Sequence, residues 1–182
     1  MPATDRPAHI WLKAALFALL ACNAVIYITQ GTLSEAIDTG AWLVLLVLFE
    51  LETDFGWGSR AGWTASTVRG TRLVAAAAVV AAAAGYVREE EWLDAVNAGI
   101  WIAMVIVLES QVRFPALAAR QRPAYSLAAG ALYAGLSAVA GAWLWQGEWF
   151  DAYDALLWLA ALVVIEANIL RRLAESKRSR AA

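Results

Sequence analysis

Three glutamates in apolar stretches are the residues best placed for ion or proton chemistry. A carboxylate in the hydrocarbon core of a membrane costs at least about 2.5 kcal/mol, so it normally faces a bundle interior, a charged partner or water. If three carboxylates converge on one axis they repel one another, and a bound proton or monovalent cation relieves that repulsion. The three residues are Glu50, Glu109 and Glu166.

The depth of these glutamates leaves a second interpretation open. Each lies about 14–15 residues, or roughly 20 Å at 1.5 Å per residue, from the expected outer end of its apolar stretch. At that depth a glutamate can also reach lipid headgroups or pair with an arginine such as Arg113, Arg171 or Arg172. Arg113 follows Glu109 by four residues, the spacing of an ion pair on one helix face. An ion site and an interfacial ion pair are both compatible with the sequence.

The glutamates belong to an internal repeat that occurs three times. Segments starting at Leu33, Trp92 and Trp149 align without gaps. Each copy would hold two spans, so the copies are expected to run parallel, as three helical hairpins related by an axis along the membrane normal. The matched positions are Glu35, Asp94 and Asp151; Asp38, Asn97 and Asp154; Trp42, Trp101 and Trp158; and Glu50, Glu109 and Glu166.

The matched acids and tryptophans each have a functional and a structural interpretation. Acids at the outer ends of the spans can concentrate cations at a pore mouth, but the helix dipole also favours an acid at a helix N-terminus. Tryptophans at one depth can pack neighbouring hairpins together or stack on a flat ligand such as a quinone. The mouth residues are Asp38, Asp94, Asp151 and Asp154, and the tryptophans are Trp42, Trp101 and Trp158.

Six apolar stretches must position these residues. The 182-residue chain is 62% hydrophobic and 16% charged, and stretches of about 17–22 residues cross a hydrocarbon core ~30 Å thick. We therefore expect one membrane domain over 1–182, an all-α polytopic bundle. The expected spans are roughly 10–30, 36–53, 71–87, 93–112, 124–146 and 152–170, paired in hairpin repeats over about 10–54, 70–113 and 124–172.

Basic residues set the expected orientation. Of the 14 Lys and Arg residues, all except Arg88 fall at one set of span ends, and the opposite ends are acidic. Cytoplasmic connectors carry the excess of Lys and Arg, so both termini are predicted to be cytoplasmic, in a bacterial inner membrane. The third stretch, 73–87, is short and needs residues 70–72 to enter the interface. Residues 55–69 are predicted to lie along the inner membrane surface.

Cysteine and histidine usage excludes several kinds of site. Cys22 and His9 are the only residues of their types, which excludes an intrachain disulfide, a thiolate cluster and a histidine-built haem or zinc site. The stretch ending at Cys22 could close a lipoprotein signal, but the apolar run continues through Ile28, which disfavours that processing. No phosphate loop, nucleophile elbow or zinc signature occurs. We expect no cofactor, no metal site, no nucleic-acid partner and no enzymatic activity.

These patterns predict a small ion channel or an ion- or proton-coupled transporter that uses the matched glutamates. Its expected partners are the lipid bilayer, a monovalent cation or proton, and either further copies of the chain or another membrane protein. The alternative is a non-catalytic structural or accessory subunit of a larger membrane complex. In that case the alanine-rich helices and the tryptophans would serve as contact surfaces.

Overall fold

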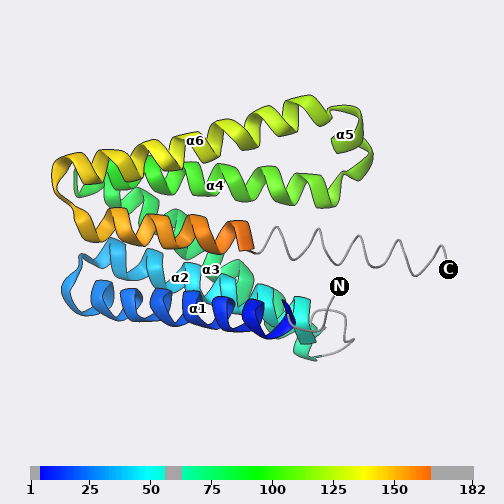
Figure 1. Ribbon diagram of the computed structural model, residues 1–182, viewed down its shortest axis with the longest axis horizontal. Helices are drawn as coiled ribbons and strands as arrows, with labels where there is room; N and C mark the ends of the chain where they lie inside the picture. The colour runs from blue at the N-terminus through cyan, green and yellow to red at the C-terminus, as the bar shows by residue number, and fades with distance from the viewer. Residues whose placement is uncertain (1–4, 56–62, 165–182) are drawn as a thin grey trace. The chain divides into compact units, whose positions relative to one another are not determined.

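The regular structure is entirely helical in the part of the chain that the structure describes. A computed structural model describes residues 5–55 and 63–164, which confirms the all-α prediction for these residues (Figure 1). Glu166 and the basic residues after it lie outside the described residues. The helices are α1 (Asp5–Gln30), α2 (Leu33–Phe55), α3 (Trp63–Arg88), α4 (Trp92–Arg113), α5 (Pro115–Arg120) and α6 (Arg122–Gln146), followed by a seventh helix over 149–164.

Four of these helices are long and apolar enough to cross a membrane. Their spans are Trp11–Gln30, Ser66–Arg88, Trp92–Gln111 and Arg122–Gln146, which is compatible with an integral membrane protein. Helix α2 carries several Asp and Glu residues, and only 149–164 of the last helix is described. Two further spans, which the sequence predicts, stay a prediction.

A reciprocal cap closes the connector between α1 and α2. Thr32 N–H donates to Glu35 Oε2 at 2.5 Å, and Glu35 N–H donates to Thr32 Oγ1 at 3.3 Å, the pattern of a capping box. Gly31 precedes this cap, and a Cβ there would lie only 2.6 Å from the Tyr27 carbonyl oxygen. Local contacts therefore account for the start of α2 at Leu33.

The connectors before α4 and before the last helix share one backbone geometry. Glu90 and Gly147 both have positive φ, 64° and 88°. In each connector the next residue donates its N–H to the carbonyl oxygen five residues earlier, at 2.9 Å, as in a Schellman motif. Glu90 and Gly147 are as far apart in the chain as Trp92 and Trp149, so they are matched positions of the predicted repeat. Glycine adopts this backbone without steric cost, whereas Glu90 does not.

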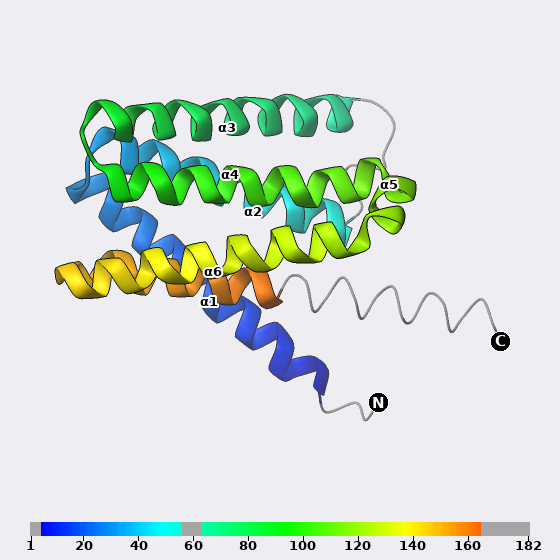
Figure 2. The same ribbon diagram turned by 90° about the horizontal axis from the view of Figure 1, so that it is seen from above.

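The described chain forms two compact units. The larger unit holds residues 23–139, and the smaller unit holds the described residues before 23 and after 139. Within the larger unit, α3 packs along both α2 and α4 (Figure 2). A Cβ on Gly85 of α3 would collide with Ser34 Oγ of α2, and a Cβ on Gly135 of α6 would lie 3.2 Å from Ile100 Cδ1 of α4. Small residues thus allow close approach of these helices.

One part of the structure differs from the sequence prediction, and one short helix adds to it. Helix α3 has 26 residues and begins at Trp63, so residues 63–69 continue its axis instead of forming a separate surface segment. No proline interrupts this stretch. The added turns make α3 long enough to span a membrane, so residues 70–72 need not enter the interface to complete the span. Residues 56–62 of the predicted surface segment lie outside the described residues. The connector after α4 contains the short helix α5, because Pro115 occupies its first turn and a proline suits that position.

Candidate functional site

Two matched tryptophans meet inside the larger unit. The ring centroids of Trp42 on α2 and Trp101 on α4 are 5.7 Å apart, with the planes inclined at 56°. Tilted pairs at this separation are favourable for aromatic rings. Both residues are half-buried. The contact turns equivalent faces of α2 and α4 toward each other, whereas Trp158 lies in the smaller unit.

Two polar residues lie one helical turn before these tryptophans. Asp38 precedes Trp42 by four residues, as Asn97 precedes Trp101, so each polar residue is about 40° around the helix from its tryptophan. Oδ1 of Asp38 and Oδ1 of Asn97 are both shielded from solvent. Asn97 Oδ1 accepts no hydrogen bond from any described residue. A buried amide oxygen in this state can accept one from a water or a protonated carboxyl, or bind a cation.

A buried phenol lies among carboxylates where α2 and α4 begin and α3 ends. We call this part of the larger unit the acidic end, and its acids are Glu35, Asp38, Glu89 and Asp94. Tyr86, in the last turn of α3, is 5% exposed. The charges of Asp38, Asp94, Glu35 and Glu89 all act on its hydroxyl. The sequence interpretation missed Tyr86 because this residue lies at the end of an alanine-rich span, outside every pattern that was compared.

The repeat could have identified this position. Aromatic residues stand at Tyr27, Tyr86 and Trp143, with the same spacings as Leu33, Trp92 and Trp149, where the three copies start. Each aromatic residue is in the last turn of the helix that precedes one of these segments. Extending the alignment backward from Leu33 would have added this aromatic position to the repeat.

A serine ties the acidic end together. The Ser34 hydroxyl donates to Glu89 Oε1 at 2.7 Å, which links the first turn of α2 to the residue after α3. Ser34 is 4% exposed. Glu35 caps α2 as described above, and Asp94 lies in the first turn of α4. At least Glu35 therefore has the structural role that the sequence left open for the outer acids.

The matched acids of the last hairpin belong to the smaller unit. Asp151 and Asp154 are half-buried in the helix over 149–164. On the same helix the rings of Phe150 and Tyr153 lie 6.5 Å apart. The structure describes this helix only within its own unit, so the predicted meeting of all three hairpins stays a prediction.

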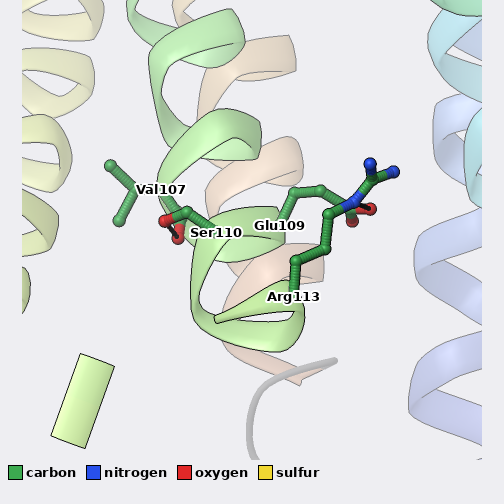
Figure 3. A network of polar contacts seen from close by, with 4 residues as sticks. All are labelled: Val107, Glu109, Ser110 and Arg113. Carbon is green, nitrogen blue, oxygen red and sulfur yellow. Dashed lines mark hydrogen bonds and ion pairs between the residues drawn. The ribbon is translucent and has the colours of Figure 1, made fainter. Parts of the chain in front are cut away.

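Glu109 is held by an arginine on its own helix. Arg113 Nε donates to Glu109 Oε1 at 2.7 Å, and the two side chains are 69% and 53% exposed. They lie together on one side of α4, away from Ser110, whose hydroxyl donates to the Val107 carbonyl oxygen (Figure 3). This contact is the ion pair that the four-residue spacing of Glu109 and Arg113 predicts.

A second ion pair lies near this end of the larger unit, which we call the basic end. Arg72 of α3 contacts Glu52 of α2, with side chains 45% and 26% exposed. Glu50, two residues before Glu52, is half-buried. The part played by Glu50 in ion binding therefore stays a prediction.

Helical geometry explains why the glutamates and tryptophans do not share a face. Glu50 follows Trp42, and Glu109 follows Trp101, by eight residues. Eight residues turn an α-helix by about 800°, which leaves each glutamate about 80° away from its tryptophan. Contact between the tryptophans is therefore compatible with an exposed Glu109.

Residues 5–55 and 63–164 contain no group of side chains that could serve as a metal site. No group of three or more His, Cys, Asp or Glu side chains in these ranges has an arrangement that could hold a metal ion, and Cys22 is an exposed free thiol. Comparison of the chain with known protein families, with curated proteins and with solved structures finds no match.

Proposed function

We propose that this chain is a small membrane ion channel or ion- or proton-coupled transporter that uses its repeat-equivalent glutamates, together with the polar residues beside the tryptophans of α2 and α4. The observation that carries the proposal is the contact between Trp42 and Trp101. Equivalent residues of two hairpins meet there, as they do around the axis of a parallel repeat. The shared connector geometry at Glu90 and Gly147 supports the internal repeat that the proposal assumes.

The proposed path has a polar level, an aromatic level and a carboxylate level. The sequence repeat assigns Asp38, Asn97 and Asp154 to the polar level, four residues before Trp42, Trp101 and Trp158. The repeat assigns Glu50, Glu109 and Glu166 to the carboxylate level. Two carboxylates and one amide at the polar level suit a proton or a monovalent cation, because a ring of acids selects for cations.

The membrane setting is part of the proposal. The six spans, the cytoplasmic termini and the bacterial inner membrane rest on the distribution of Lys and Arg in the sequence. This setting is compatible with two arrangements. The path could be formed by the repeat copies of one chain, or by several chains together. Partners are therefore further copies of the chain or another membrane protein.

Flux through liposomes tests the proposal. Purified chain in liposomes should pass protons or potassium ions, followed with an internal pH dye or a potassium-dependent membrane potential. Asp38→Asn and Glu50→Gln should each lower the flux about tenfold or more, since each removes a charge that the path needs. Ser137→Ala, at an exposed position of α6, is the matched control and should leave the flux unchanged. Flux no greater than that of empty liposomes would refute the proposal.

The alternative is a non-catalytic structural or accessory subunit. The ion pairs Glu109–Arg113 and Glu52–Arg72 favour it, because both neutralise carboxylates near the basic end. Purification from native membranes should then recover partner proteins in fixed stoichiometry, and the isolated chain should show no flux. Flux without such partners would exclude this alternative.

A further inference from the structure

The corner that joins α4, α5 and α6 exposes apolar side chains. Helix α5 has six residues, none of them buried. Phe114, just before it, is 59% exposed, and Leu117 within it is 44% exposed. We call residues 113–122 the basic corner. These exposed apolar side chains lie at the end of two helices that can span a membrane.

The basic corner carries positive charge with little compensation. Arg113, Arg120 and Arg122 are exposed, and no Asp or Glu occurs between Glu109 and Glu148. Arg113 is paired with Glu109. Among the described residues, Arg120 and Arg122 have no ion pair.

Hydrogen bonds hold the basic corner in one shape. Phe114 N–H donates to the Ser110 carbonyl oxygen, and Gln121 N–H donates to that of Leu117, both at 2.9 Å. The hydroxyl groups of Ser110 on α4 and Tyr125 on α6 lie 3.2 Å apart, within hydrogen-bond distance. These hydrogen bonds define the backbone positions from which the arginines and the apolar side chains extend.

We propose that the basic corner binds an anionic phospholipid. Arg120 and Arg122 would contact the phosphate, because a guanidinium group donates two parallel hydrogen bonds to its oxygens. Phe114 and Leu117 would enter the acyl boundary beside it, as apolar residues of interfacial segments do. A soluble anion would leave these two side chains in water, so the lipid is the better match. The inference needs membrane insertion but does not depend on ion transport.

A lipid titration of the full chain tests the inference. The chain is kept in micelles of uncharged detergent, phosphatidylglycerol is added, and backbone hydrogen exchange is followed over residues 114–122. Exchange should slow with phosphatidylglycerol and stay unchanged with phosphatidylcholine. The double substitution Arg120→Gln with Arg122→Gln should raise the midpoint lipid concentration about 30-fold, since each arginine near an anionic surface contributes roughly fivefold. Circular dichroism checks that the variant keeps its helix content.

Three comparisons decide between the outcomes. Arg69→Gln with Arg88→Gln, at two exposed arginines of α3, is the charge-matched control and should leave the midpoint unchanged. Phe114→Ala with Leu117→Ala should raise the midpoint with all arginines kept. Equal protection by glycerol 1-phosphate would show a soluble-anion site, and equal protection by phosphatidylcholine would show simple micelle contact. Either result overturns the inference.

Discussion

The two ends of α2 and α4 hold their polar residues in different ways. At the acidic end, Asp38 and Asn97 lie one turn from a pair of tryptophans that face each other, with an oxygen of each shielded from solvent. At the basic end, Glu109 is exposed and paired with Arg113. Both ends belong to the same helices. The presence of a carboxylate in an apolar helix therefore does not by itself identify an ion site. The angle of the carboxylate around the helix decides whether it faces a neighbouring helix or an arginine.

Loss of a tryptophan should have the largest effect on stability. Trp42→Ala or Trp101→Ala should lower the free energy of unfolding by about 3 kcal/mol, because each leaves a large gap between α2 and α4. The double variant should show a coupling of about 0.5–1.5 kcal/mol between the rings. Unfolding in detergent micelles measures both. Trp145→Ala, at a position 91% exposed, is the control, and an equal loss there would show that the tryptophan contact has no special role.

A side chain at Gly85 should have the next largest effect. Gly85→Val should lower the free energy of unfolding by about 2 kcal/mol, since its Cβ collides with Ser34 Oγ and forces α2 and α3 apart. Gly130→Val has no neighbouring atom within 4 Å of the added Cβ and serves as the matched control. The same unfolding assay compares them. Equal stability of the two variants would contradict the close approach at the acidic end.

Replacement of the buried amide should separate stability from function. Asn97→Leu should change the free energy of unfolding by less than about 1 kcal/mol, because it removes an acceptor oxygen without a described donor. The proposed polar level nevertheless predicts a clear loss of liposome flux in this variant. Unchanged flux would remove Asn97 from the proposed path.

Removal of the exposed ion pair should have the smallest effect. Glu109→Gln should change the free energy of unfolding by less than about 1 kcal/mol, because exposed pairs contribute little. Its flux should fall less than that of Glu50→Gln, since Arg113 already neutralises Glu109. Flux and unfolding assays on both variants, with Arg113→Gln for comparison, measure the difference. A larger flux loss in Glu109→Gln would reverse the contrast between the two ends.

Local patterns explain how much of the candidate site the sequence could predict. The tryptophan contact was one of two interpretations of the repeat, and Glu109–Arg113 was one of two interpretations of a four-residue spacing. Tyr86 was missed because one aromatic residue at the end of an alanine-rich span has no pattern of its own. Arg72 on α3 is paired with Glu52 on the preceding helix. Residue spacing along one helix cannot predict such a pair, because its two members lie on different helices.

The sequence by itself determined the helices, because apolar runs, a capping box and residues such as Gly31 and Pro115 act on their own neighbours in the chain. It also determined the alignment of the segments that start at Leu33, Trp92 and Trp149. Only the tertiary structure decided which helix faces met in the larger unit. Packing between α2, α3 and α4 depends on the direction of each side chain around its helix. That direction places Trp42 against Trp101, and it pairs Arg72 of α3 with Glu52 of α2.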